Sequence, residues 1–248
     1  MKPISQIDIA PTIARTLGFE IKSDGAPIKA VEGWQCRNAI LIIVDSLGYD
    51  LYQRMKPRLS SMPALADEGF LFRARSVSNH TSPAIASILS GLLPEHHHIT
   101  DTKAARHSPL LSIPEIATSA GLRSAVVMEK EGAMVYEELI EFIGAVPGTL
   151  IPLDFDKEAC RLSLDALSSA PRLLVSYFIG IDKAAHNSLP VDGFMKAVVD
   201  IDGYIGKIVD RADRGTMIVV VGDHPVHAGP FKRTHGPYCV PILIGKKV

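Results

Sequence analysis

Five short apolar runs, rich in β-branched residues, constrain the fold of this chain more than any other feature. They cover residues 39–44, 124–128, 173–179, 216–221 and 240–244. Runs of this length and composition are typical of buried parallel strands. Helix-length segments lie between them, at residues 82–89, 112–120, 156–168 and 191–211. This alternation predicts an α/β fold with a doubly wound, mostly parallel sheet and helices on both faces.

Length and composition favour a single globular domain. A chain of 248 residues is long enough to bury one large core. Its hydrophobic content of 47% and its formal net charge of -1 are those of an ordinary globular protein. We therefore expect neither a nucleic-acid polymer nor a membrane as a partner, and the oligomeric state stays open.

Cysteine usage and the N-terminus predict a cytoplasmic protein. The three cysteines lie far apart without a C-x-x-C pair, which indicates neither a disulfide framework nor a sulfur-ligated zinc site. The first residues lack a long apolar stretch, and the other apolar runs are well below the ~20 residues that span a bilayer.

Polar residues follow three of the predicted strands directly. They are Asp45, Asp182, Asp223 and His224. Each one alone is equally well explained as a helix cap, but the carboxyl ends of parallel strands meet at one edge of a sheet. Together with His186 and His235, these residues favour a metal site at that edge.

The residue types in this set suit hard or borderline divalent cations. Carboxylates and imidazoles without any thiolate are the expected ligands of zinc or manganese in a hydrolytic site. Asp182 and His186 are four residues apart, so a helix there would direct both at one ion. Asp223 and His224 are adjacent, and a tight turn would let both face one ion. We expect two divalent cations, with zinc the best match and manganese or iron also suitable.

Five motifs resemble those of the alkaline phosphatase superfamily. They are Asp45-Ser46-Leu47-Gly48, Asn79-His80-Thr81-Ser82-Pro83 with Ser90-Gly91, Asp182 through His186 with Pro190, Asp223-His224, and Thr234-His235-Gly236. Their order along the chain is similar to that of the superfamily. The spacing from Thr81 to Gly91 resembles that of the nucleotide pyrophosphatase/phosphodiesterase branch.

The resemblance implies a two-zinc site with a threonine nucleophile. One ion would be held by Asp45, Thr81, Asp223 and His224, and the other by Asp182, His186 and His235. Coordination by a metal would stabilise the alkoxide of Thr81, which is otherwise a weak nucleophile at neutral pH. A phosphothreonine would form and then be hydrolysed by water.

The residues after Thr81 narrow the implied activity. Sulfatases of this superfamily carry a modified cysteine or serine followed by a proline and an arginine, whereas this chain has Thr81-Ser82-Pro83-Ala84-Ile85. Members with a threonine are typically phosphodiesterases, pyrophosphatases or phosphonoacetate hydrolases. We therefore expect a hydrolase of phosphodiester or pyrophosphate bonds, with a small phosphate ester or a nucleotide as substrate.

Two other interpretations stay open. A phosphomonoesterase, a phosphonate hydrolase or a phosphoryl-transfer mutase would use the same Thr81 chemistry. A non-catalytic metal-binding scaffold or partner subunit would fit the short chain and its minimal cap, although the intact ligand set favours an enzyme. Asn79, His80 and His227 are candidates for contact with substrate, and each is equally plausible as a surface group.

The N-terminal segment resembles one that normally follows the last metal-binding histidine in this superfamily. Asp8, Pro11 and Gly18 predict a helix with a cap, a first-turn proline and a terminating glycine. We infer a circular permutation in a single domain, 1–248, with a permuted helix at 1–18, a connector at 19–38 and the metal-site core at 39–248. The alternative is an ordinary amphipathic N-terminal helix.

Overall fold

The computed structural model of the chain describes residues 3–233 and 236–248. These residues form a seven-stranded sheet in the order β2-β7-β6-β1-β5-β3-β4. The strands are β1 (Ala39–Val44), β2 (Phe70–Arg75), β3 (Ser124–Glu129), β4 (Phe142–Val146), β5 (Leu173–Phe178), β6 (Met217–Gly222) and β7 (Cys239–Lys246). The central strand β1 runs parallel to its neighbours β5 and β6. The predicted α/β fold with a mostly parallel sheet is confirmed.

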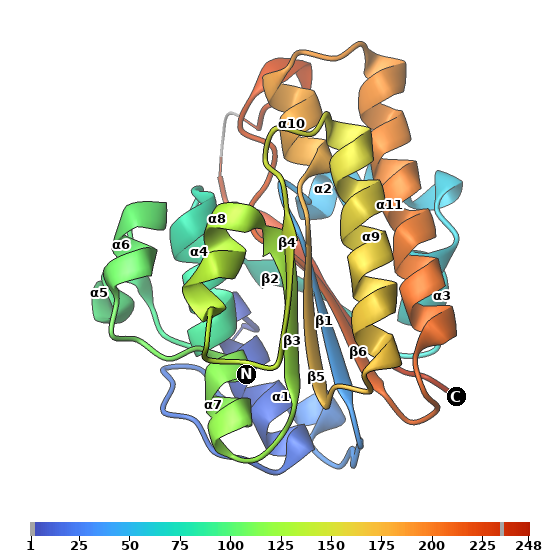
Figure 1. Cartoon of the computed structure of the whole chain (residues 1–248). Helices are drawn as coiled ribbons and strands as arrows, with labels where there is room; N and C mark the ends of the chain where they lie inside the picture. The colour runs from blue at the N-terminus through green and yellow to red at the C-terminus, as the bar shows by residue number, and fades with distance from the viewer. Residues whose placement is uncertain (1–2, 234–235) are drawn as a thin grey trace.

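Helices cover both faces of this sheet (Figure 1). One face carries α3 (Ser61–Asp67), α9 (Pro152–Ser168) and α11 (Val191–Arg211), and the other carries α1 (Ile9–Leu17), α4 (Thr81–Ser90) and α7 (Ile113–Ser119). Shorter helices are α2 (Tyr49–Met55), α5 (Pro94–His97), α6 (Thr102–His107), α8 (Lys130–Ala133) and α10 (Gly180–His186). Across the described part of the chain, no helix is both long enough and apolar enough to cross a membrane.

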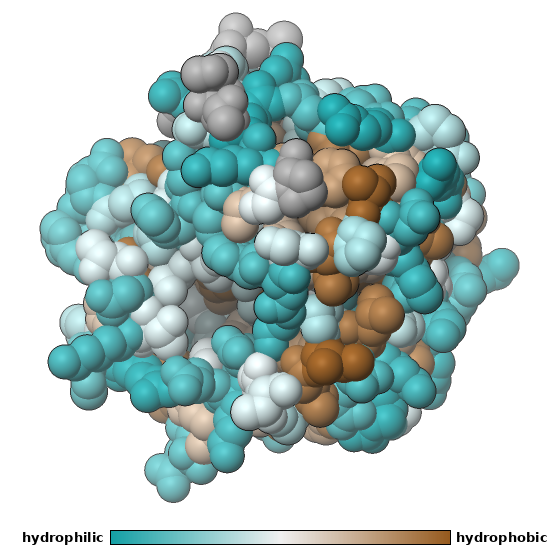
Figure 2. Space-filling model, turned by 90° about the horizontal axis from the view of Figure 1, so that it is seen from above, coloured by the Kyte–Doolittle hydropathy of each residue, from teal (hydrophilic) through white to brown (hydrophobic). Residues whose placement is uncertain are grey.

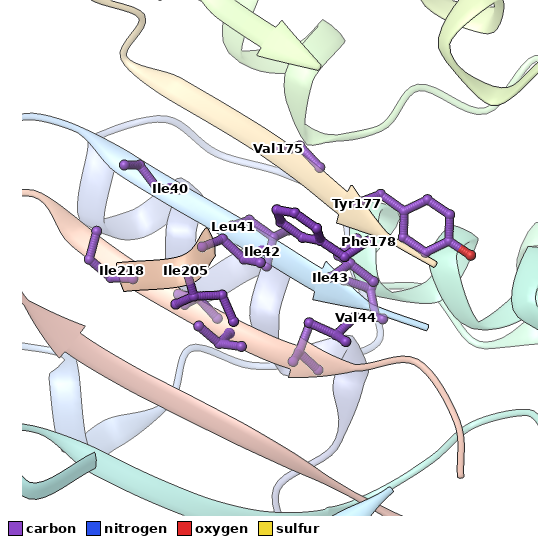
Figure 3. Packing of buried hydrophobic residues seen from close by; sticks show 14 of the residues in the cluster. Ile40, Leu41, Ile42, Ile43, Val44, Val175, Tyr177, Phe178, Ile205 and Ile218 are labelled. Atoms are coloured by element: carbon purple, nitrogen blue, oxygen red, sulfur yellow. The ribbon is translucent and has the colours of Figure 1, made fainter. Parts of the chain in front are cut away.

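The central strands are apolar on both sides because both faces of the sheet are covered. Every residue of β1 is buried. Successive side chains of a strand point to opposite faces. Phe178 accordingly stacks on Tyr204 of α11, with 6.3 Å between ring centroids, while Tyr177 reaches the other face near the carboxyl end of β5 (Figure 3).

The two outer strands of the sheet differ from the sequence prediction. The strand at residues 240–244 was expected to be parallel, but β7 runs antiparallel to both β6 and β2. The edge strands β2 and β4 have no counterpart among the predicted strands. In β2 only Ala74 is buried, so this strand lacks the continuous apolar run that marks the central ones.

The predicted N-terminal helix is present as α1. Gly18 ends it with a left-handed φ of 84°, a conformation that glycine adopts without strain. Asp8 precedes the helix, but its carboxylate accepts hydrogen bonds from the amides of Ser5 and Ala26, both at 2.9 Å, rather than capping α1. The circular permutation and the divisions at residues 18 and 38 stay predictions.

Candidate metal centre

Strand register places two of the predicted aspartates side by side. Val44 of β1 is the register partner of Gly222 in β6, and Asp45 and Asp223 are the next residues along each strand. Because the strands are parallel, both carboxylates leave the sheet at the same edge. This is the end of the molecule that Figure 2 views from above, where the surface is hollowed and largely hydrophilic.

A third aspartate reaches this edge from β5. The strand leads directly into α10, which carries Asp182 and His186 one helical turn apart. The nearest atoms of the two side chains, His186 Nε2 and Asp182 Oδ1, are 3.5 Å apart. The predicted placement of this pair on a helix is confirmed. Asp156 of α9 accepts hydrogen bonds from the amides of Ile179 and Gly180, at 3.0 and 3.1 Å, and so fixes the start of α10.

The first candidate metal group converges on the Nε2 atom of His224. This atom lies 3.1 Å from Thr81 Oγ1 and 3.5 Å from both Asp45 Oδ1 and Asp223 Oδ2. Asp45, Asp223 and His224 are all buried. These four side chains are the ones that the superfamily resemblance assigns to one zinc ion.

A hydrogen bond on the other ring nitrogen orients His224 for metal binding. Nδ1 lies 3.1 Å from the carbonyl oxygen of Pro225, which can only accept, so Nδ1 carries the proton. Nε2 is then left with a free lone pair that faces the two carboxylates. A backbone carbonyl on the second nitrogen is the usual way in which a protein fixes the tautomer of a metal-binding histidine.

The electrostatics of this group favour a cation between the carboxylates. Within the described residues, the buried atoms Asp45 Oδ1 and Asp223 Oδ2 have no hydrogen-bond partner. Burial raises the pKa of Asp45 well above its ordinary value, and the charges of Asp223 and Asp182 raise it further. Burial likewise raises the pKa of Asp223. A divalent cation would offset both effects, so the donor set fits such an ion in charge and in ligand type.

Two residues that the sequence reasoning missed hold the ligands in place. Ser46 donates from its backbone amide to Asp223 Oδ1 at 2.9 Å and from its hydroxyl to Asp182 Oδ1 at 2.8 Å, which links the two candidate metal groups. The hydroxyl of Tyr177 donates to Asp45 Oδ2. Ser46 stands next to Asp45 in the sequence, but nothing in the sequence pattern connects Tyr177 with this site.

The second candidate metal group is formed by Asp182, His186 and His227. The Nε2 atoms of His186 and His227 are 3.0 Å apart, and His227 Nδ1 is 3.8 Å from Asp182 Oδ1. From the sequence His227 is a candidate substrate contact, whereas in the structure its ring lies among the candidate metal-binding atoms. His235, the third predicted ligand of this group, lies outside the described residues. The sequence feature that could have indicated this role for His227 is its position three residues after His224.

The predicted nucleophile lies at the start of a helix. Thr81 is the first residue of α4, and the exposed His80 is its N-cap. Asn79 is exposed as well, in the loop that leads to this helix. Both candidate substrate contacts are therefore close to Thr81 along the chain and accessible.

The histidine-rich segment after α4 makes contacts that support the fold. His97 Nε2 lies 3.0 Å from the hydroxyl of Ser87 in α4, and His97 Nδ1 accepts from the amide of Ile99 at 3.0 Å. His96 pairs with Asp24 at 2.7 Å. These contacts attach the segment to α4 and to the N-terminal connector.

Two family models match parts of this chain. A sulfatase model matches residues 37–139, and a type I phosphodiesterase / nucleotide pyrophosphatase model matches residues 115–236. A comparison with curated protein sequences gives no match.

Several solved structures share the fold. Phosphonoacetate hydrolase from Sinorhizobium meliloti 1021 has a TM-score of 0.65 at 15% identity, over 83% of this chain and 59% of that one. A putative sulfatase from Bacteroides thetaiotaomicron VPI-5482 has a TM-score of 0.65 at 13% identity, over 85% of this chain and 64% of that one. A protein of the alkaline phosphatase superfamily from Vibrio parahaemolyticus has a TM-score of 0.64 at 15% identity, over 98% of this chain and 68% of that one.

The fold and the family matches define a phosphatase-like α/β architecture. The family-model matches and the shared fold agree with the resemblance of the chain's sequence motifs to the alkaline phosphatase superfamily. The chain spans 59% of the length of the phosphonoacetate hydrolase.

Proposed function

We propose that the chain hydrolyses phosphodiester or pyrophosphate bonds, with Thr81 as the nucleophile and two divalent cations as cofactors. The observation that carries this proposal is the position of the Thr81 hydroxyl, 3.1 Å from His224 Nε2. The same nitrogen lies 3.5 Å from two buried carboxylate oxygens that have no hydrogen-bond partner among the described residues. A threonine that served only as a helix cap would not need this surrounding.

Each candidate metal group would hold one ion. Asp45, Thr81, Asp223 and His224 would hold the first, and Asp182 and His186 the second, with His227 or His235 completing it. Zinc fits these oxygen and nitrogen donors best, and manganese or iron would also suit them. When bound, the cations would supply the positive charge that stabilises the threonine alkoxide and the oxygens of the phosphoryl group.

Thr81 would then displace the leaving group directly. Its Oγ1 forms a bond to phosphorus as the ester or anhydride bond breaks, the hydroxyl proton passes to solvent, and the departing oxygen takes up a proton. Water cleaves the resulting phosphothreonine and restores the hydroxyl. Because Thr81 is the first residue of the ten-residue helix α4, its own amide and that of Ser82 are free to donate to phosphoryl oxygens.

The charge of the site favours a singly charged diester. Two divalent cations against three aspartates and a threonine alkoxide would leave the site near neutral. Lys183, the basic residue next to Asp182, donates from its Nζ to the carbonyl of Gly148 at 2.6 Å, in the loop between β4 and α9. A phosphonate or monoester substrate is the second candidate, because a phosphonoacetate hydrolase has the same fold.

Hydrolysis of model substrates tests the proposal. We expect the wild-type chain with zinc or manganese to turn over bis-p-nitrophenyl phosphate faster than p-nitrophenyl phosphate. Thr81→Ala should abolish this turnover, and the matched variant Thr81→Ser, which keeps a hydroxyl, should retain part of it. Turnover of the monoester alone would favour the second candidate. Metal binding without any turnover would instead favour a non-catalytic scaffold.

A further inference from the structure

A largely apolar pocket opens beside Thr81, and its lining includes none of the residues of the second metal group. Its volume is about 160 Å³. Thr81, Ile85 and Leu89 line it from successive turns of α4. Met128, at the end of β3, and Val135 are among the apolar residues of the remaining wall. The pocket thus continues from the reactive hydroxyl into a hydrophobic interior.

Most hydroxyl groups that line the pocket already contact other polar groups. Ser112 Oγ donates to Glu115 Oε2 at 2.8 Å and lies 3.1 Å from the hydroxyl of Tyr136. The hydroxyl of Tyr177 is occupied by Asp45. Ser82 and Thr102 contact each other, with 3.3 Å between their hydroxyl oxygens. A ligand would therefore meet mainly hydrocarbon surface, whose burial is favourable for apolar groups and costly for polar ones.

The pocket also disfavours anionic ligand groups. Among the described residues that line it there is no lysine, arginine or histidine, while Glu115 and Glu129 belong to its wall. An anionic group would gain no partner and would be repelled by these carboxylates. The volume is close to that of an engineered cavity of ~150 Å³ that binds benzene.

We infer that this pocket binds the uncharged organic group of the phosphate ester, and that it selects for an aromatic ring or a compact alkyl group over a polar or anionic one. This inference rests on the proposed function, since it takes Thr81 as the point where phosphorus is attacked. The phosphate would remain at the metal-binding edge, and the organic group would extend along α4.

Binding of two simple phosphonates tests the pocket without requiring turnover. We would measure the affinities of phenylphosphonate and methylphosphonate for the zinc-loaded full chain by titration calorimetry. The two probes carry the same anionic head, so their difference reports only on the organic group. We expect phenylphosphonate to bind about 10- to 100-fold more tightly, as burial of one ring predicts.

Substitutions in α6 and at Val135 test whether the preference for the phenyl group arises in the pocket. Ala105 lines the pocket, and Ala105→Phe should fill it and bring the affinity ratio close to one. Ala104 is on the same helix but outside the lining, so Ala104→Phe is the matched control and should keep the ratio of the wild type. Val135→Ala enlarges the pocket and should shift the preference from phenyl- towards naphthylphosphonate.

The outcomes separate this inference from the proposed function. Equal affinities for the two probes, or no binding of either, would overturn the inference even if diesters are hydrolysed. A ratio that survives Ala105→Phe would overturn it as well. A preference for the phenyl group that Ala105→Phe removes would support the inference, even if Thr81→Ala showed no loss of hydrolysis and the proposed function failed.

Discussion

The side-chain amide of Gln6 donates a hydrogen bond of 2.6 Å to the backbone carbonyl of Asp223. The same nitrogen lies 2.8 Å from the carbonyl oxygen of Gly222, and the oxygen of the Gln6 amide accepts from the backbone of Val77 at 2.9 Å. Gln6 is fully buried. One residue of the N-terminal segment thereby connects the strand end that carries Asp223 with the loop that leads to Thr81.

Replacing Gln6 should therefore affect both stability and metal binding. Gln6→Ala leaves two carbonyls and one amide without this partner, and we expect the free energy of unfolding to fall by about 1–3 kcal/mol. Zinc affinity should fall too, because the loops that carry Asp223 and Thr81 are no longer held together. Denaturant unfolding of the metal-free chain and a zinc titration measure the two effects. Gln53→Ala, at an exposed glutamine of α2, should change neither. Unchanged zinc affinity in the Gln6 variant would contradict the positioning role.

Metal ions should stabilise the folded chain through the first candidate group. The buried carboxylates of Asp45 and Asp223 repel each other, so a bound cation would offset an unfavourable charge arrangement. Free zinc at a hundredfold excess over its dissociation constant should add about 2.7 kcal/mol to the free energy of unfolding. Chelation should reverse this gain.

Thermal melting with zinc and with chelator measures the effect of the metal. Asp45→Asn should greatly reduce the difference between the two melting temperatures. Asp210→Asn, at an exposed residue of α11, is the control and should keep the difference of the wild type. A shift that persists in Asp45→Asn would show that the ions bind elsewhere.

His227 should contribute to binding of the second ion. Its ring lies between the two candidate groups, with Nε2 at 3.0 Å from His186 Nε2. We expect His227→Ala to lower the zinc stoichiometry from two ions to one, because Asp182 and His186 alone provide too few ligands for a stable site. Equilibrium dialysis followed by metal analysis gives the stoichiometry. The matched variant His107→Ala, at an exposed histidine of α6, should still bind two ions. If His227→Ala still binds two ions tightly, the third ligand of the second ion is another residue. His235 would then be the first residue to substitute.

The parts of the site that sequence predicts are those fixed by local spacing. Asp182 and His186 are four residues apart, so the helix period alone brings them together. Asp45 and Asp223 follow buried strands, and their proximity needs only that β1 and β6 be parallel neighbours. Tyr177 could not be found in this way, because its contact with Asp45 depends on the side of β5 from which its ring emerges.

The difference between local spacing and long-range contacts also explains the errors in the predicted fold. Central strands such as β1 are recognisable because they are apolar and buried throughout, whereas Ala74 is the one buried residue of the edge strand β2. Composition does not fix strand direction, so β7 was assigned the direction of the other strands, although it runs opposite to β6. The position of His227 depends on the loop after His224, whose path no periodicity describes.

Stability should depend on pH through Asp156, which lies in α9 and holds the start of α10. Burial raises the pKa of Asp156 to about 7, although hydrogen bonds from the amides of Ile179 and Gly180 act in the opposite direction. The folded chain therefore binds this proton more tightly than the unfolded chain does. The contribution of this proton to the free energy of unfolding is fully present below about pH 4, the ordinary pKa of an aspartate. It is lost as the pH rises through about 7.

Asp156→Asn removes this titration, since an amide stays neutral and its oxygen can still accept from the two backbone amides. The free energy of unfolding of the variant minus that of the wild type should increase between pH 4 and 7, by at most about 1.4 kcal/mol per pH unit, and should be constant above this range. Denaturant unfolding at pH 4.5, 6 and 8 checks the trend. Asp165→Asn, on the exposed side of the same helix, is the control. Its free energy of unfolding should stay within about 1 kcal/mol of the wild-type value at each pH. If the difference between Asp156→Asn and wild type is the same at all three pH values, the carboxylate of Asp156 is ionised throughout and its hydrogen bonds outweigh its burial.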